Sequence, residues 1–149
     1  MAIRNIIQTD DPVLRRRSRP VEKFDDRLAQ LLDDLIDTMT KAEGCGLAAV
    51  QVGVLRRVAV VDCGEGVIEL VNPEIISADG VQEEQEGCLS FPGEYGVTSR
   101  PAIVKVKAQN RAGIWHFYKA DGLKARAFCH EIDHLDGVLF QSRVIRKEP

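Results

Sequence analysis

Several features that mark common protein classes are missing from this sequence of 149 residues. It contains no apolar run of about 18 residues, the length that a membrane-spanning helix needs. Its N-terminal segment, MAIRNIIQTDDP, lacks the long apolar stretch and the small-residue cleavage site of a secretory signal. The net charge is −3, and the only dense basic run is Arg15-Arg16-Arg17. The composition therefore gives no electrostatic indication of DNA binding or of attachment to an anionic membrane.

Cysteine is scarce and widely spaced. The four cysteines are Cys45, Cys63, Cys88 and Cys129, and no two of them form a CxxC pair. This spacing favours a reducing, cytosol-like compartment, where most cysteines are small buried apolar residues. Apolar residues make up 44% of the chain and charged residues 29%, as in an ordinary soluble domain. We expect residues 1–149 to fold as one domain with a core of its own.

The spacing of apolar residues predicts two long helices and one short one. Residues 25–42 and the segment from Gly122 to Asp136 are the long ones, with Gly44 and Gly137 as the glycines that stop them. The short helix begins at Asp10-Asp11-Pro12, a carboxylate cap followed by proline, and should end before Pro20. The apolar stripe of the first long helix consists of Leu28, Leu31, Leu32, Leu35, Ile36 and Met39.

Between these helices the pattern changes to short β-rich runs. VAVVD (58–62) and VIELVN (67–72) flank Gly64-Glu65-Gly66, which indicates a hairpin. Residues 103–108 alternate apolar and basic side chains, residues 110–113 form a turn, and residues 114–119 return as a strand. Helices followed by antiparallel strands and a final helix predict an α+β fold.

The stretch HEIDHLDG, residues 130–137, carries the pattern HExxH. On a helix, positions four apart lie on one face, so His130 and His134 can both reach one metal ion. Glu131 flanks that site, where a carboxylate can move a proton from water. Three fixed letters also match by chance, so the alternative is an ordinary polar helix.

A catalytic metal site needs a third protein ligand and an open position. Cys88 in EGCLS (86–90) is the best candidate, because Gly87 lets the backbone approach closely just before it. A thiolate beside two imidazoles suits Fe(II), Zn(II), Co(II) or Ni(II) better than Mg or Ca. The alternative is a buried free thiol.

The stretch GCGLAAVQ, residues 44–51, has little side-chain bulk and can approach a peptide backbone closely. Gln51 follows it as an uncharged amide donor. The stretch lacks the lysine and the hydroxyl of a phosphate-binding loop. A tight helix-to-strand connection that needs small residues explains this spacing equally well.

Together, GCGLAAVQ, EGCLS and HEIDHLDG resemble the three signature motifs of the peptide deformylases, in the same order and at the same separations. The resemblance covers nearly the whole chain. It implies an α+β fold in which antiparallel sheets pack around a C-terminal metal-binding helix, with N-terminal helices. It also implies an enzyme that removes the N-terminal formyl group from formyl-methionyl nascent polypeptides and releases formate.

The resemblance assigns a role to each motif residue. Cys88, His130 and His134 would bind one divalent metal ion, natively Fe(II), with Zn(II), Ni(II) or Co(II) able to substitute. Glu131 would be the general acid/base. The oxyanion hole would consist of the Gln51 amide and the Leu89 backbone N–H. The substrate-binding residues would be Gly46, Glu86 and Gly87 along the peptide backbone, and Leu123 at the methionine pocket.

Three positions depart from the usual pattern of the family. Val50 stands where proline is frequent, and Cys129 stands where glutamine often precedes the first metal histidine. Arg126, one turn before His130, lies either at the pocket rim or in solvent.

Asp133 should face away from the metal and pair with Arg100, unless it is simply solvated.

The resemblance further implies an N-formylmethionyl peptide as substrate, transient association with the ribosome, and a bacterial cytoplasm as location. We expect no direct DNA binding and no membrane partner. Two other functions stay open: an HExxH metallopeptidase that acts on unformylated peptides, and a catalytically degenerate metal-binding homologue.

Overall fold

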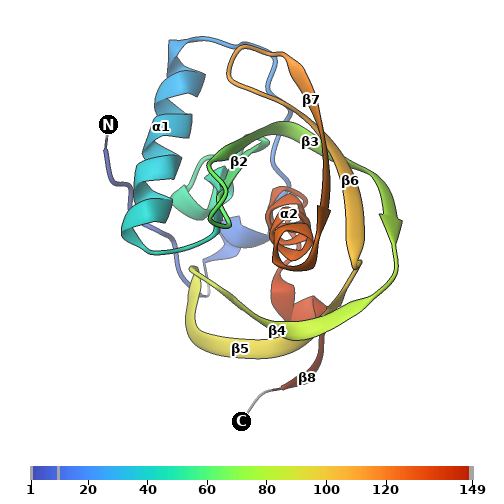
Figure 1. Cartoon of the computed structure of the whole chain (residues 1–149). Helices are drawn as coiled ribbons and strands as arrows, with labels where there is room; N and C mark the ends of the chain where they lie inside the picture. Colours follow the sequence, from blue (N-terminus) through green and yellow to red (C-terminus); the bar gives the residue numbers. More distant parts are fainter. Residues whose placement is uncertain (1, 10, 148–149) are drawn as a thin grey trace.

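The computed structural model describes residues 2–9 and 11–147, and it contains two long helices and two antiparallel sheets (Figure 1). In chain order the elements are η1 (Pro12–Arg15), α1 (Asp26–Lys41), β1 (Gly46–Ala48), η2 (Ala49–Val52), β2 (Val58–Val61), β3 (Ile68–Asp79), β4 (Gln82–Cys88), β5 (Phe91–Arg100), β6 (Ile103–Gln109), β7 (Trp115–Asp121), α2 (Gly122–Leu135), η3 (Phe140–Arg143) and β8 (Val144–Lys147). No helix among the described residues has both the length and the apolar character needed to cross a bilayer.

The sheets surround the second helix. One has five strands in the order β1-β2-β3-β6-β7, and the other has three in the order β4-β5-β8. Every strand pair is antiparallel. Figure 1 shows α2 near the centre of the molecule with the strands curving around it, and α1 along one side. The predicted α+β architecture, with antiparallel sheets around a C-terminal helix, is confirmed.

Helix α1 matches its prediction closely. The Asp25 side chain accepts a hydrogen bond from the backbone N–H of Leu28 at 3.1 Å and so caps the first turn. The leucines of the predicted stripe are buried, with Leu28, Leu32 and Leu35 fully covered. They pack against β1 and β2, which explains why an amphipathic segment folds onto the five-stranded sheet here.

The short N-terminal helix is shorter than predicted. The structure confines it to the single 3-10 turn η1, capped by Asp11 through the N–H of Val13. Asp10, the first residue of the predicted start, lies outside the described residues. Leu14 is fully buried, so this turn is held by one apolar anchor. Arg15, the first of the three consecutive arginines, is the last residue of the 3-10 turn, and the backbone is already extended at Arg16.

The predicted hairpins are confirmed, whereas β1 and all of the small sheet had no sequence prediction. β2 pairs with β3 across Gly64 and Gly66, both in the left-handed region, and β6 pairs with β7. By contrast, β4 reads QEEQEGC and β5 contains Pro92, Gly93 and Gly96. Neither strand shows a regular apolar alternation, so neither resembles a half-buried strand in sequence.

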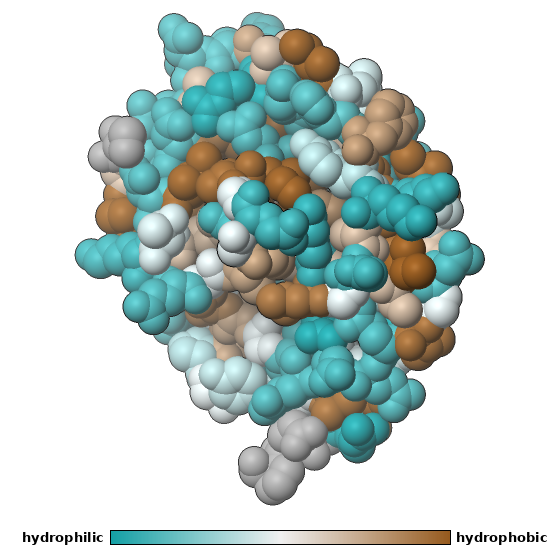
Figure 2. Space-filling view, in the orientation of Figure 1, coloured by the Kyte–Doolittle hydropathy of each residue, from teal (hydrophilic) through white to brown (hydrophobic). Residues whose placement is uncertain are grey.

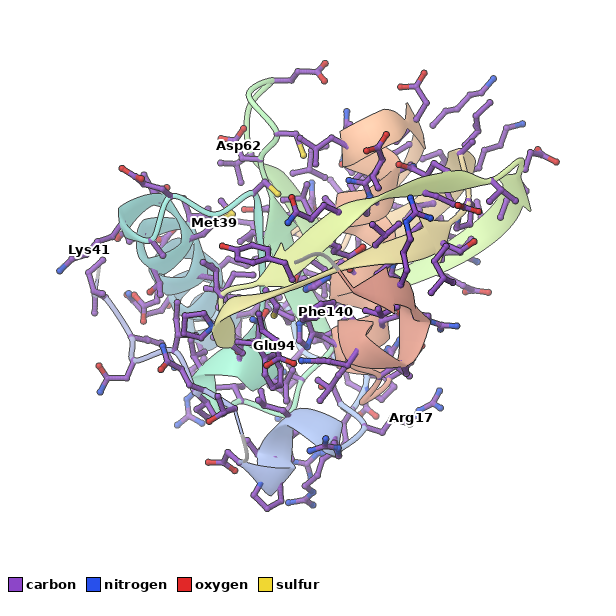
Figure 3. All side chains as sticks on the ribbon, turned by 90° about the horizontal axis from the view of Figure 1, so that it is seen from below. Arg17, Met39, Lys41, Asp62, Glu94 and Phe140 are labelled. Atoms are coloured by element: carbon purple, nitrogen blue, oxygen red, sulfur yellow. The ribbon has the colours of Figure 1, made fainter. Side chains whose placement is uncertain are left out.

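The core falls into an α1 side and an α2 side. The α1 cluster joins that helix to β1 and β2, and the α2 cluster joins α2 to the opposite face of the five-stranded sheet. A smaller cluster holds Leu14, Phe91, Leu139 and Phe140 together. Figure 3 shows Phe140 toward the middle of the molecule, with Arg17 and Lys41 at its periphery. Figure 2 shows the face that Figure 1 presents. That face is largely hydrophilic, with several hydrophobic side chains near its middle.

Candidate metal and catalytic site

The two histidines of HEIDHLDG lie one turn apart on α2, as their spacing predicts. Their Nε2 atoms are 3.2 Å apart, and both side chains are buried. The helix ends at Leu135, and Gly137 follows with φ 76°. A Cβ on Gly137 would collide with the backbone of Arg15, so glycine is required where the chain leaves the site.

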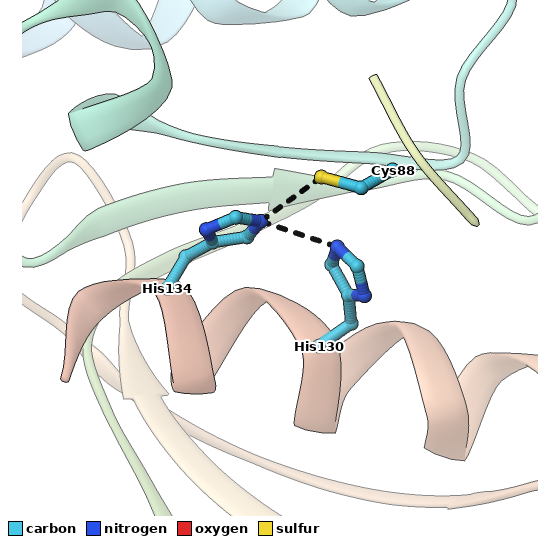
Figure 4. A group of neighbouring side chains, drawn as sticks. All are labelled: Cys88, His130 and His134. Atoms are coloured by element: carbon cyan, nitrogen blue, oxygen red, sulfur yellow. Dashed lines mark hydrogen bonds between the residues drawn. The ribbon is translucent and has the colours of Figure 1, made fainter. Parts of the chain in front are cut away.

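Cys88, the last residue of β4, completes the predicted group of three. Its Sγ lies 3.2 Å from His134 Nε2 (Figure 4). The ligand atoms of Cys88, His130 and His134 all lie within 4.8 Å of one another. The β4–β5 register shifts between Glu86 and Cys88, and such an irregularity re-aims a side chain at a strand end.

These residues fit one divalent metal ion. Metal–ligand bonds of about 2.0–2.3 Å place the ligand atoms of one tetrahedral ion roughly 3.5 Å apart, close to the separations found here. Burial lowers the pKa of His134 well below its ordinary value, which favours the neutral imidazole that binds metals. Two buried polar atoms at the site, Glu131 Oε1 and His134 Nδ1, have no hydrogen-bond partner among the residues that the structure describes. Structural sites close with four protein ligands, whereas three leave a position open.

His130 is held from behind by Glu86. The Nδ1 atom of His130 lies 2.6 Å from Glu86 Oε2, which leaves Nε2 facing Cys88 and His134. Burial alone would lower the pKa of His130, but the negative charge of Glu131 and the contacts with Cys88 and Glu86 outweigh it and raise the pKa. Binding of a metal ion at Nε2 therefore releases a proton.

The side chain of Glu86 has a role that the sequence did not reveal. It accepts hydrogen bonds from Thr98 at 2.7 Å and from two nitrogens of Arg100 at 3.1 and 2.7 Å. Burial tends to raise the pKa of this carboxyl, but the bonds from His130 and Arg100 lower it to about 2. Because its carboxylate is fully engaged here, only its backbone is free to contact a peptide. A carboxylate that orients a metal-binding histidine is a recurrent arrangement.

The predicted pair between Asp133 and Arg100 is confirmed. Arg100 Nη1 donates to Asp133 Oδ2 at 2.6 Å, and Arg143 also pairs with Asp133 at 3.1 Å. Arg100 thus bridges Asp133 on α2 and Glu86 on β4, and its own side chain is buried. This bridge ties the helix that carries both histidines to the strand that carries Cys88.

Glu131 is buried beside the histidines. Burial raises its pKa to about 7, so near neutral pH the carboxyl can both accept and return a proton. A Cβ added to Gly46 would overlap the Glu131 carboxylate. Gly46 of the first motif is therefore small because the Glu131 carboxylate occupies the space beside it.

Gln51 lines the same cavity as Glu131. Its Oε1 accepts the backbone N–H of Ala48 at 2.9 Å, which orients the amide. Its Nε2 donates to Ser90 Oγ at 3.1 Å and lies 3.5 Å from Cys88 Sγ. The amide donor of the first motif therefore contacts both Cys88 and Ser90 of the second motif.

A cavity of about 430 Å³ opens onto this group. It is lined by all four predicted substrate-binding residues, and also by Gln51, Leu89 and Glu131. Leu123 is 54% exposed and so stands at the rim. Arg126 lines the cavity as well, where it donates a hydrogen bond to Gln82.

Cys129 is buried, unlike a residue at the pocket surface. Only 4% of it is exposed, and burial raises the pKa of its thiol to about 11. It belongs to the apolar cluster between α2 and the five-stranded sheet. Packing therefore explains this cysteine, and its burial away from solvent makes it a poor target for oxidation.

Comparison with known proteins confirms the resemblance drawn from the three motifs. The model of the family described as polypeptide deformylase matches residues 3–149. A peptide deformylase of Alkaliphilus metalliredigens is 57% identical over 147 residues, 99% of this chain and 100% of that protein. One from Caldicellulosiruptor bescii is 58% identical over 146 residues, 98% of this chain and 88% of that protein.

Solved structures agree. The crystal structure of peptide deformylase from Thermotoga maritima superimposes with a TM-score of 0.94 and 41% identity, covering 100% of both chains. That of a Legionella pneumophila peptide deformylase gives a TM-score of 0.93 and 44% identity, over 96% of this chain and 86% of the other. With the motifs, the fold and the full-length matches in agreement, the chain belongs to the polypeptide deformylase family.

Proposed function

We propose that residues 1–149 form one catalytic domain that hydrolyses the N-terminal formyl group of formyl-methionyl polypeptides through the cavity above α2. Members of the family are enzymes that remove this group from nascent peptides. The observation that carries the proposal is the convergence of Cys88, His130 and His134 beside a buried Glu131.

Glu131 acts as the general acid/base. A divalent metal ion held by Cys88, His130 and His134 would lower the pKa of water toward about 7 and polarise the formyl oxygen. The Glu131 carboxylate takes a proton from the attacking water and delivers it to the leaving nitrogen. Its raised pKa supports this assignment, since a group with a pKa of about 7 exchanges protons readily at neutral pH.

The oxyanion is met by two donors. The Gln51 amide and the backbone N–H of Leu89 stabilise the negative charge that grows on the formyl oxygen. Each donor of this kind is typically worth about 10²–10³ in rate. The orientation of Gln51 by the Ala48 N–H supports its role, because a preoriented amide needs no rearrangement during the reaction.

The peptide lies along the cavity. The backbones of Gly46, Glu86 and Gly87 pair with the substrate backbone, and Leu123 covers the methionine side chain at the rim. The position of these residues on the cavity wall supports this arrangement. A Cβ on Gly87 would collide with the ring of Tyr95, which also lines the cavity, so the backbone there packs closely against that ring.

Fe(II) is the native metal, and Zn(II), Ni(II) or Co(II) can replace it. One thiolate and two imidazoles suit all four ions. An iron–thiolate centre is open to oxidation, so protein loaded with iron should lose activity in air faster than protein loaded with nickel. Iron-loaded protein that keeps its activity through prolonged aerobic handling would contradict this expectation.

The proposed substrate also indicates where in the cell the enzyme works. Formyl-methionine occurs on chains that leave the ribosome, so the enzyme works in transient association with ribosomes in a bacterial cytoplasm. No direct DNA contact and no membrane partner are proposed.

A metallopeptidase that acts on unformylated peptides is the alternative, and one assay separates the two. Formate release from formyl-Met-Ala-Ser is measured with anaerobically purified protein, beside unformylated Met-Ala-Ser and the Glu131→Ala variant. We expect formate from the wild type, little from the variant and no cleavage of peptide bonds. Absence of formate, despite one metal ion bound per chain, would favour a degenerate homologue, and cleavage of Met-Ala-Ser would favour the peptidase.

A further inference from the structure

Cys45 is the one cysteine whose exposed side chain lies at the substrate cavity. It stands between Gly44 and Gly46 in the first motif, and it lines the cavity. Its neighbour Gly46 packs against the Glu131 carboxylate, and partial burial, followed by the charge of Glu131, raises the pKa of the Cys45 thiol. A group attached to Cys45 would therefore occupy space that the peptide needs.

Cys63 lies directly across from this segment. β1 and β2 pair with Gly46 opposite Val61, and the N–H of Asp62 donates to the carbonyl of Cys45 at 3.0 Å. Cys63 is the next residue, at the base of the β2–β3 hairpin, where Asp62 is labelled in Figure 3. Diagonal neighbours in an antiparallel pair are roughly 6 Å apart between Cα atoms. Disulfides span about 4.4–6.8 Å between Cα atoms.

The two thiols interact in the folded protein. Burial and the neighbouring Cys45 raise the pKa of Cys63 to about 11, and the Cys63 thiol hydrogen-bonds with that of Cys45. Cys63 lies in a bend, outside the regular β1–β2 ladder, so the alternation of side chains along the strand does not apply to it.

The hairpin that carries Cys63 has room to move. Gly64 and Gly66 both have left-handed backbone, and a Cβ at either would meet nothing within 4 Å. The Cys45 side has no such freedom. A Cβ added to its neighbour Gly44 would lie 2.7 Å from the Leu89 side chain, and a Cβ added to Gly46 would overlap the Glu131 carboxylate. A bond between the two sulfurs would therefore draw the hairpin inward and leave the cavity wall in place.

We propose that Cys45 and Cys63 are a thiol–disulfide exchange site for small-molecule disulfides, in which Cys63 displaces adducts from Cys45 and so keeps the deformylase cavity open. The proposal rests on the function given above. In the first step the Cys45 sulfur attacks a disulfide RSSR, which gives Cys45–S–SR and one RSH. In the second, the Cys63 sulfur attacks Cys45 Sγ, forms the Cys45–Cys63 disulfide and releases the second RSH. The two thiol protons leave on the two RSH molecules, and RSSR is reduced by two electrons.

Oxidised glutathione is the probe. Reduced, metal-loaded wild type and the Cys63→Ser variant are incubated with it at pH 8.5, where thiolates form more readily, and then alkylated. Each sample is analysed by intact mass, by peptide mapping and by formate release, relative to its own untreated portion. Metal loading keeps Cys88 coordinated, and the Cys129→Ala variant serves as a matched control for loss of a thiol outside the pair.

We expect the wild type and Cys129→Ala to lose two hydrogens, to yield a Cys45–Cys63 cross-linked peptide and to keep most of their activity. Cys63→Ser should instead carry one glutathione on Cys45 and lose activity about tenfold or more, because the adduct fills the cavity. Dithiothreitol should restore it. A wild type that stays reduced, or that retains the adduct, would overturn the proposal, and so would an adduct-bearing Cys63→Ser variant with full activity. Failure of the deformylase function itself would appear separately, as an inactive untreated wild type.

Discussion

The two long helices face very different surroundings. α1 packs its leucines against β1 and β2, and the cluster there consists of apolar side chains. Around His130 on α2, by contrast, three charged residues are buried or nearly so: Glu86, Arg100 and Asp133. Both regions are densely packed. α1 buries one carboxylate, Asp34, which pairs with Arg4, whereas the α2 region removes a connected set of charges from water.

This difference suggests that the α1 region mainly determines stability and the α2 region mainly determines activity. Apolar burial on α1 stabilises the fold by roughly 1.5–3 kcal/mol for each large side chain. Relative to apolar side chains of the same size, the buried ions add little net stability, because desolvation offsets most of their attraction, but removing one charge from the set is costly. They do fix where His130 points and how α2 sits against β4. The first region should therefore be sensitive in melting experiments, and the second in activity and metal binding.

Glu131→Gln should give the largest effect on activity. Removing the general acid/base costs about 10²–10⁴ in kcat, while the amide keeps the shape of the side chain. The free energy of unfolding should change little or rise, because a buried carboxyl with one unpartnered oxygen is lost. Formate release and thermal unfolding on the same preparation check both parts. Near-normal kcat would remove Glu131 from the mechanism.

Leu32→Ala should affect the opposite property. Leu32 is fully buried in the α1 cluster, so truncation should lower the free energy of unfolding by about 2–5 kcal/mol. Below the melting temperature kcat should be unchanged. Urea unfolding beside Arg27→Ala, an exposed position on the same helix, isolates the packing effect. A large fall in kcat of Leu32→Ala below its melting temperature would contradict the expectation that the α1 region affects stability and not activity.

The sequence predicted the apolar side of this comparison better than the polar side. Leu28 to Met39 repeat at helical spacing, and each of the two predicted hairpins joins runs of strand-forming residues, so local patterns specify α1, β2–β3 and β6–β7. β4 and β5 gave no such signal. In β4 and β5, Glu86 and Arg100 form a buried ion pair with each other. A local stretch of sequence does not reveal such a contact between residues on different strands.

At the site, the motif residues were predicted and their supports were mostly not. The spacing of His130 and His134 is local, so one helix turn brings them together. Glu86 lies 44 residues before His130, and nothing in EGCLS tells its side chain from that of any other glutamate. Only Arg100 with Asp133 was anticipated, from the face of α2 that Asp133 had to occupy.

Acid should weaken the polar region first. The pKa of Glu86 is about 2 in the folded protein against an ordinary 4.5, so its stabilisation is present above pH 4.5 and is lost as the pH falls toward 2. The loss amounts to about 3 kcal/mol. Because the pKa of His130 is raised above 6.5, His130 stays protonated throughout this window and adds no slope. Urea unfolding of metal-free protein between pH 5 and pH 2 measures the change.

Glu86→Gln is the matched control for that measurement. The variant lacks the titrating carboxyl, so its stability should fall less steeply over the same acid range than that of the wild type. Metal-free samples are needed because release of a bound ion at low pH would add its own destabilisation. Equal slopes in the two proteins would mean that other carboxyls dominate acid unfolding.

Asp25→Ala should have the smallest effect on the free energy of unfolding, and that effect should be confined to the start of α1. The Asp25 side chain satisfies the N–H of Leu28 at the start of α1, and loss of such a cap costs about 1 kcal/mol. Asp25→Ser should restore most of it, since serine also caps. Because α1 contributes packing and not chemistry, kcat and metal affinity should not change in either variant. Equilibrium unfolding with metal titration on the same samples decides the matter. A weaker metal affinity in Asp25→Ala, reversed in Asp25→Ser, would mean that the two regions are coupled through β1, which lies against both helices.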